Sequence, residues 1–160
     1  PPPPPPPPPL FFFTPTPPYE MLRRLVGSEM CIRDRVEEAA IAHKVKTGQI
    51  VKTIALMIDK PILLMFAGDM KIDNKKYKEY FKVKAKMLSP EDTERFTSHP
   101  IGGVCPFGLP LKLSVYWDIS MKKYEFVIPA AGSKNSSVII NRKVLINMVS
   151  AVQVDVTVAK

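Results

Sequence analysis

The alternation of apolar and polar positions divides residues 36–160 into short strands and helices. Apolar runs and period-two alternation predict strands over residues 49–58, 62–68, 83–87, 113–118, 124–130, 136–140 and 151–158. Apolar positions at helical spacing predict helices over residues 36–44, 74–81, 90–98 and 142–150. Strands outnumber helices and several neighbours are joined by short turns. We therefore expect an α+β fold with a mixed, largely antiparallel sheet and flanking helices.

Three of these helices begin at residues that favour a helix N-terminus. Asp73 precedes NKKYKEYF, and Asn141 precedes RKVLINMVS. Ser89 is followed by Pro90, whose fixed φ suits the first helical position. The side chains of Asp73, Ser89 and Asn141 are therefore predicted to cap these helices.

Residues 1–35 have a different character from the rest of the chain. Nine prolines, a Phe triplet and further prolines follow without apolar periodicity, so this stretch cannot bury a core. Residues 19–35 match the translation of a sequencing-library adapter, and residues 1–18 match low-quality read-through. We expect residues 1–35 to be non-native and disordered, and 36–160 to form one domain that lacks its native first strand. The alternative is a natural proline-rich linker.

Charge and cysteine content narrow the function classes. The net charge of +8 falls to +7 without residues 1–35, which carry four Arg and three acidic residues. Cys105 is then the only thiol, and no secretory signal is present, so we expect a cytoplasmic protein without a disulfide. The most apolar stretch, 54–68, is interrupted by Asp59, Lys60 and Pro61, so we expect no membrane span.

No cofactor or metal site is predicted from the sequence. The chain has neither a Walker loop nor a dinucleotide-binding glycine motif. His43, His99 and Cys105 do not supply an adequate ligand set for zinc.

Five motifs in order resemble those of one known family. They are QIVKTIAL around Lys52, AGDMKID at 67–73, PIGGVCPFG at 100–108, VYWDIS around Asp118 and AAGSKNSS at 130–137. Together they resemble the YbaK domain, also called the prolyl-tRNA synthetase associated domain. The resemblance implies a sheet curled around a pocket. It also implies an enzyme that hydrolyses the ester between a wrong amino acid and the 3′ end of tRNA, typically Cys or Ala on proline tRNA. The implied partners are tRNA and, in addition, prolyl-tRNA synthetase.

The resemblance also implies a set of site residues. Lys52 is expected to hold the terminal adenosine, and the amides of Gly102 and Gly103 to bind the developing oxyanion. The residues expected to contact the substrate are Val104, Cys105, Pro106, Phe107, Asp118, Gly132 and Ser133. The open alternatives are an outward-facing Lys52, glycines that merely close a turn, and an Asp118 that only ends its strand.

Two further questions concern the thiol and the lysines. A catalytic Cys105 would need a nearby base, and nothing in the sequence links His43 or His99 to its sulfur, so a packed thiol is the preferred interpretation. Six lysines form a local basic region that either meets tRNA phosphates or is an ordinary solvated surface: Lys75, Lys76, Lys78, Lys82, Lys84 and Lys86. A non-catalytic module that binds an aminoacyl or nucleotide end, or a protein, is the alternative function.

Overall fold

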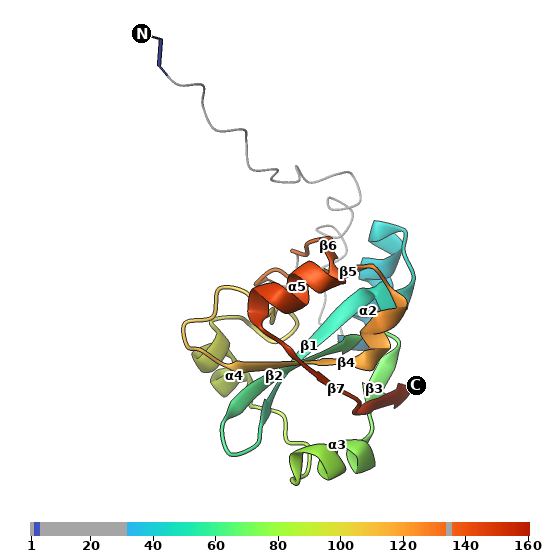
Figure 1. Ribbon diagram of the computed structural model, residues 1–160, viewed down its shortest axis with the longest axis vertical. Coiled ribbons are helices and arrows are strands. Elements are labelled where there is room, and N and C mark those ends of the chain that lie inside the picture. Colours follow the sequence, from blue (N-terminus) through green and yellow to red (C-terminus); the bar gives the residue numbers. More distant parts are fainter. Residues whose placement is uncertain (1, 4–31, 134–135) are drawn as a thin grey trace.

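A curled six-stranded sheet forms the centre of the molecule (Figure 1). The computed structural model describes residues 2–3, 32–133 and 136–160, with the backbone alone for residues 32–35. The strand order is β6-β5-β1-β2-β4-β7. The bounds are β1 Ile50–Met57, β2 Pro61–Ala67, β4 Ser114–Asp118, β5 Phe126–Pro129, β6 Ile140–Asn141 and β7 Val152–Val154.

The pairings make the sheet mixed, and the α+β fold class is confirmed. The antiparallel β1–β2 hairpin is the longest pairing, from Val51↔Ala67 to Met57↔Pro61. β5–β6 is also antiparallel, whereas β1–β5, β2–β4 and β4–β7 are parallel. A second sheet of two antiparallel strands joins β3 (Met70–Ile72) to β8 (Thr157–Ala159).

In the part of the chain that the structure describes, four helices surround the sheet: α2 (Ile32–His43), α3 (Asn74–Phe81), α4 (Pro90–Thr97) and α5 (Arg142–Val149). The three predicted caps are confirmed, because Asp73, Ser89 and Asn141 each accept backbone N–H groups of the first turn. Two short 3₁₀ segments, η1 (Thr47–Gln49) and η2 (Ile119–Lys123), complete the elements. Helix α2 crosses the expected boundary between residues 35 and 36.

Each face of the β1–β2 hairpin is covered by a different apolar cluster. On one face Val51, Ala55 and Met65 pack with α5 through Leu145, and we call this cluster the α5 core. On the other face Leu56, Leu64 and Phe66 pack with Tyr77 of α3, and we call it the α3 core. Side chains alternate between the faces of a strand, so the parity of a residue in β1 decides which core it joins.

Three strand predictions were wrong in extent. Within residues 83–87 only Met87 pairs, through a single bridge to Leu56, and 136–140 forms a bridge at Ser137 before the short β6. The stretch 151–158 is split into β7 and β8, which belong to different sheets. Periodicity alone could not show this break, because the apolar alternation runs through it unchanged.

The carboxylate of Asp118 holds the chain where 151–158 is split. Asp118 is fully buried; its Oδ1 accepts from Val156 N at 2.7 Å, and its Oδ2 accepts from Thr157 Oγ1 at 2.7 Å and from Ser120 N at 2.9 Å. Ser120 Oγ in turn accepts from Ala67 N. Asp118 thus ties the end of β4 to the link between β7 and β8 and to the end of β2.

Replacing Asp118 by Ala is expected to lower the free energy of unfolding by at least about 3 kcal/mol, because three buried donors lose a charged acceptor. Asp155→Ala is the matched control; its ion pair with Lys76 is exposed to solvent, so a much smaller loss is expected. Urea unfolding measures both. Equal losses in the two variants would contradict the role given to Asp118.

Candidate functional site

The outer edge of β1, the edge away from β2, is covered in two separate pieces. At its start Val51 pairs with Pro129 of β5. Near its end Leu88 N donates to Ala55 O, and Met57 N donates to Lys86 O. Among the described residues no strand pairing covers this edge at Lys52, Thr53 and Ile54, which lie between the two pieces, and we call this interval the edge gap.

Lys52 is half-buried and lies on the α3 side of the sheet. Its partner across the hairpin is Phe66, and its Nζ lies 5.8 Å from the centroid of the Phe66 ring. A cation over an aromatic face is attracted by the ring quadrupole. The neighbouring Thr53 points to the opposite side, and its Oγ1 is buried without a hydrogen-bond partner.

The glycine pair forms a turn next to the α5 core. Gly103 N donates to Pro100 O at 2.9 Å, and Gly102 has a φ of +86°, an arrangement that fits a type II turn. The amide of Gly103 is therefore already used inside the turn. The amides of Gly102 and Val104 have no acceptor among the described residues, which leaves Gly102 as the donor of the pair that can meet a ligand.

Lys52 and the glycine turn approach β1 from opposite faces. Val104 belongs to the α5 core with Val51 and Ala55, whereas Lys52 shares the α3 side with Phe66. We therefore expect the two groups to serve one ligand only at a stretch of β1 whose edge is uncovered among the described residues. A single pocket containing Lys52 and Gly102 stays a prediction, and the edge gap is its place.

His99 connects the two loops that were assigned to the site. On one side Cys105 Sγ lies 3.9 Å from Nδ1 and 3.8 Å from Nε2 of His99. On the other side, a methyl group at Gly132 would lie 3.2 Å from Cδ2 of His99. Thr97, fully buried, fixes the backbone of His99 by accepting from its N–H at 3.1 Å. The sequence pattern indicates no role for His99 beyond that of a potential partner for the thiol.

The geometry around Cys105 is that of packing. The sulfur is nearly equidistant from both ring nitrogens, at the long end of the range for a sulfur hydrogen bond, so neither nitrogen is singled out as a base for the thiol. Burial raises the pKa of the Cys105 thiol, and its hydrogen bond to Phe107 O lowers it by less. Burial lowers the pKa of His99. Both groups are therefore neutral near pH 7, without a thiolate–imidazolium pair.

The second site loop, 130–137, continues directly from β5. Gly132 has a φ of +91°, and the exposed Ser133 accepts or donates a 2.7 Å hydrogen bond with Ser136. His43 Nε2 lies 2.8 Å from Ser137 Oγ, which ties the end of α2 to this loop. Since Pro129 pairs with Val51, the loop begins at one end of the edge gap.

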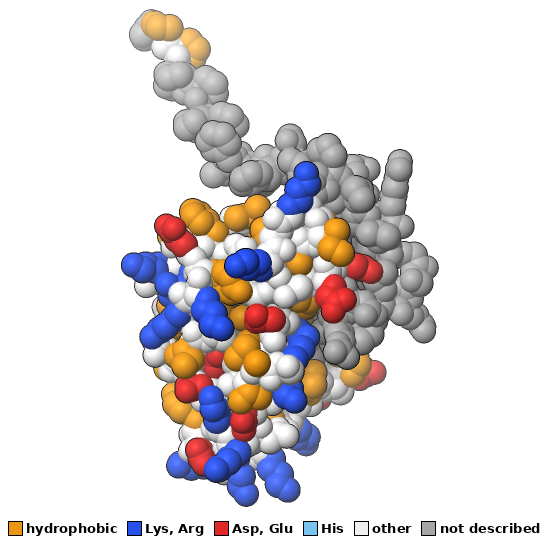
Figure 2. Space-filling view, turned by 90° about the vertical axis from the view of Figure 1, so that its right-hand side faces the viewer, with side chains coloured by type: hydrophobic (Ala, Val, Ile, Leu, Met, Phe, Trp, Pro, Cys, Tyr) orange, Lys and Arg blue, Asp and Glu red, His pale blue; other side chains and the backbone are white. Residues whose placement is uncertain are grey.

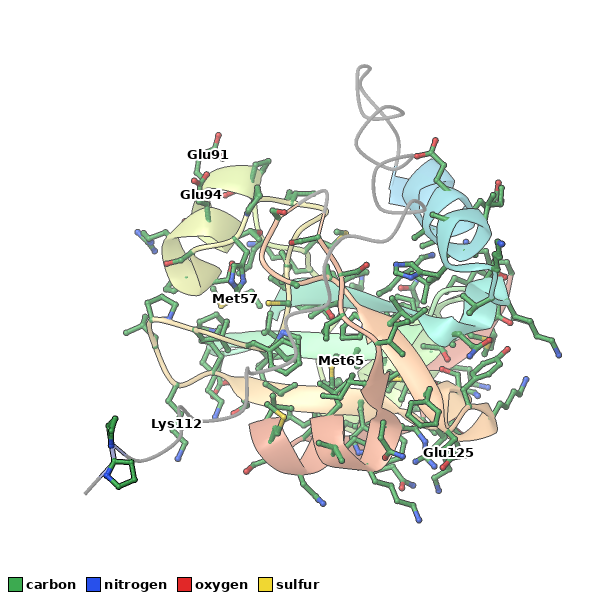
Figure 3. The ribbon with its side chains drawn as sticks, turned by 90° about the horizontal axis from the view of Figure 1, so that it is seen from above. Met57, Met65, Glu91, Glu94, Lys112 and Glu125 are labelled. Atoms are coloured by element: carbon green, nitrogen blue, oxygen red, sulfur yellow. The ribbon has the colours of Figure 1, made fainter. Side chains whose placement is uncertain are left out.

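Pro106 and Phe107 line a different hollow. They border a groove of about 480 Å³ between residues 106–113 and the end of α5, where Met148 and Val149 form the facing wall. Lys112, which is labelled in Figure 3, lines this groove. The same view shows α4 near the Met57 end of β1 and α2 near the other end. Neither Lys52, Gly102 nor Gly132 lines the groove.

Asp118 is buried away from solvent, and its carboxylate oxygens accept hydrogen bonds in the interior.

The described residues contain neither a candidate metal site nor a candidate membrane-spanning helix. In those parts of the chain, no cluster of three or more His, Cys, Asp or Glu side chains is arranged to hold a metal ion. Nor does any helix there combine the length and apolarity needed to cross a membrane.

Comparisons with known proteins agree with one another. The model of the aminoacyl-tRNA editing domain matches residues 33–148. The uncharacterized protein YwhH of Bacillus subtilis (strain 168) is 46% identical over 112 residues, covering 69% of this chain and 71% of its own. A crystal structure of a candidate trans-editing enzyme for prolyl tRNA synthetase has a TM-score of 0.72 at 24% identity, covering 90% of this chain and 99% of that one. A scaffold protein used for computational epitope grafting has a TM-score of 0.74 at 24% identity, covering 91% and 99%.

The thiol of Cys105 is expected to react slowly in the folded protein. In a Cys31→Ser background, alkylation by iodoacetamide at pH 8 should be at least about tenfold slower than in the denatured chain, because the folded thiol keeps its proton and is buried. The same raised pKa means that stability falls as pH rises above about 8.5, the ordinary thiol value, and Cys105→Ser should lack this fall. Alkylation as fast as in the denatured chain would show an exposed, activated thiol.

Gly132→Ala should disturb His99, whereas Gly108→Ala should not. Both glycines have positive φ, but a methyl group at Gly132 meets the His99 ring, and one at Gly108 meets nothing within 4 Å. We expect Gly132→Ala to lower the free energy of unfolding by about 1 kcal/mol more than Gly108→Ala. It should also shift the NMR signals of the His99 imidazole. Unchanged His99 signals in Gly132→Ala would contradict the contact between the loops.

Proposed function

Because the chain belongs to the aminoacyl-tRNA editing domain family, we propose that it hydrolyses the ester of mischarged tRNA in trans. The proposed substrates are Cys or Ala attached to tRNA(Pro). The candidate trans-editing enzyme that shares this fold supports the choice of proline tRNA. The observation that carries the proposal is the edge gap, which holds the half-buried Lys52 and which β5 and residues 86–88 leave uncovered among the described residues. The glycine turn is proposed to lie on its other side.

Hydrolysis of this ester does not require a side-chain nucleophile. An aminoacyl ester is already activated, so the site has to orient it and stabilise the oxyanion that develops on its carbonyl oxygen. The N–H of Gly102 is the proposed donor, because the Gly103 amide is used by the turn. The positive φ of Gly102 and its lack of a side chain allow close approach of the ester.

Lys52 is proposed to anchor the 3′-terminal adenosine through its phosphate or sugar. Its ammonium lies half-buried over Phe66, so an anion at the edge gap would meet a charge that is already positioned. The buried Thr53 hydroxyl, without a partner of its own, adds hydrogen-bonding capacity in the same interval. The loop 130–133, held by His99 through Gly132, would close the other side of the pocket.

The attacking group in this proposal is a water molecule or the substrate's own thiol. The neutral Cys105 over His99 offers no activated sulfur, so a covalent intermediate on the protein is not part of the mechanism. For Cys-tRNA(Pro), the thiol of the cysteine attacks its own ester carbonyl, the bond to the tRNA oxygen breaks, and that oxygen takes up the thiol proton. Water then opens the resulting thiolactone to give free cysteine. For Ala-tRNA(Pro), a positioned water attacks the carbonyl, and the products are free alanine and uncharged tRNA.

The test is deacylation of Cys-, Ala- and Ser-tRNA(Pro), with correctly charged Pro-tRNA(Pro) as the reference substrate. Lys52→Ala should lower kcat/KM for the cleaved substrate by at least about 100-fold, because it removes the anchoring cation. The fold should be retained, since Lys52 is only half-buried. Lys60→Ala, an exposed lysine in the β1–β2 turn, is the matched control and should leave the rate unchanged. Cys105→Ser should remain active.

Two results would overturn this proposal. Saturable tRNA binding with deacylation at the rate of the buffer would identify a non-catalytic binding module. Loss of all activity in Cys105→Ser with every substrate would identify a thiol hydrolase.

A further inference from the structure

The positive charge of this protein is concentrated in one short segment. Residues 71–86 contain seven lysines and only two acidic residues, a net charge of +5, compared with +8 for the whole chain. Figure 2 shows Lys and Arg side chains gathered at the lower end of the molecule, which is where α3 lies in Figure 1. Such a concentration attracts a polyanion far more strongly than the same charges dispersed.

Helix α3 turns its lysines outward in a regular row. Tyr77 is fully buried and Phe81 packs on the same α3 core, so these two residues define the inner side of the helix. Lys75, Lys78 and Lys82 follow one another at spacings of three and four residues, and all three are exposed. They therefore form one stripe on the solvent side.

The segment after α3 carries further lysines along β1 toward the edge gap. Its residues 86–88 pair with the outer edge of β1, through Met57 N to Lys86 O and Leu88 N to Ala55 O. Lys84 and Lys86 are exposed on this segment. The lysine track is defined as Lys75, Lys78, Lys82, Lys84 and Lys86. It leads from α3 toward the edge gap. Lys86 contacts Met57, and five residues of β1 at 3.3 Å per residue separate Met57 from Lys52, so the two lie about 17 Å apart along the strand.

The acidic residues nearby do not neutralise the track. Asp155 pairs with Lys76 at 2.9 Å, which is why Lys76 is left out of the track. Asp73 is engaged in capping α3. Among the described residues, no carboxylate lies within ion-pair distance of a track lysine, although Glu79 lies on the same helix. The track thus remains available to an external anion.

An aromatic cluster lies beside the track. Tyr80 is 47% exposed and makes edge contacts with Phe81 and Tyr116, at centroid distances of 4.8 and 6.4 Å. Exposed aromatic rings among cations are typical of surfaces that contact nucleic acid. Lys52 and α3 lie on the same side of the sheet, so one bound RNA can reach both.

We propose that the lysine track binds the sugar-phosphate backbone of the tRNA acceptor stem while the 3′ end occupies the edge gap. This inference rests on the proposed function for its substrate, but it concerns a different surface. The track supplies affinity and orientation, whereas the edge gap holds the ester.

The test compares two variants with the same change in charge. The track variant carries K75Q, K78Q, K82Q, K84Q and K86Q; the control variant carries K46Q, K112Q, K123Q, K143Q and K160Q, exposed lysines elsewhere on the molecule. Binding of uncharged tRNA is measured by fluorescence anisotropy over a range of salt concentrations. A Lys→Arg version of the track variant tests rescue by charge.

The track variant should bind uncharged tRNA at least about tenfold more weakly near 0.1 M salt. Its log–log salt slope should fall by about 2 to 4, at 0.7–0.9 for each lost phosphate contact. The control variant should stay within about twofold of wild type, and the Arg version should recover. With charged tRNA, KM should rise in the track variant and kcat should not change. The track variant should cleave an aminoacylated CCA trinucleotide at the wild-type rate, because this substrate lacks the acceptor stem that the track is proposed to bind.

Failure of this inference can be told apart from failure of the proposed function. An unchanged salt slope, an equal loss in the control variant, or slower cleavage of the trinucleotide by the track variant would overturn the track. The lysine-track proposal would also be overturned if the wild-type protein did not bind tRNA. This holds even if the track were then found to bind a protein. A track-dependent salt slope without any deacylation would retain the track and overturn only the enzymatic proposal.

Discussion

The backbone hydrogen bonds of β1 set the arrangement of the whole sheet. On its inner edge β1 pairs with β2 from Val51 to Met57, which fixes the hairpin at the centre of the sheet. On its outer edge, among the described residues, the strand is covered first by β5 and then by residues 86–88, and these two coverings leave Lys52, Thr53 and Ile54 between them. An uncovered strand edge presents unpaired polar groups, and a native protein must cover, charge or use them. Here the interval carries a lysine on one face and a buried hydroxyl on the other.

The side-chain alternation of β1 gives this edge its chemical asymmetry. Even-numbered residues from Lys52 to Leu56 lie on the α3 side of the sheet, and odd-numbered residues face the α5 core, which includes Val104 next to the glycine turn. We therefore place the cation and the turn on opposite faces, with the edge of β1 as their proposed meeting point. A ligand bound at this edge would contact Lys52 on one face of β1 and the glycine turn on the other, with its nucleic-acid part directed toward α3.

His99 shows how a side chain outside the expected set organises the site. It is buried between Cys105 and Gly132, and its backbone is fixed by Thr97. Burial raises the pKa of the Cys105 thiol, so the cysteine is protonated and fills the space beside the imidazole. On the other side of the ring, a Cβ at Gly132 would lie only 3.2 Å from Cδ2 of His99, which favours glycine at this position.

The class of fold, the helix caps and the order of the motifs follow from the sequence alone, because they depend on local periodicity and on hydrogen bonds between neighbouring residues. Asp73, Ser89 and Asn141 cap their helices as predicted. Three features became visible in the folded molecule: residues 151–158 split at the bonds to Asp118, the Gly103 amide donates to Pro100, and His99 joins the two loops. Each of these is a contact between side chains or amides whose partners the sequence pattern does not specify. The same holds for Lys52 and the glycine turn: their motifs were visible in the sequence, but the face that each one occupies depends on the register and curvature of the assembled sheet.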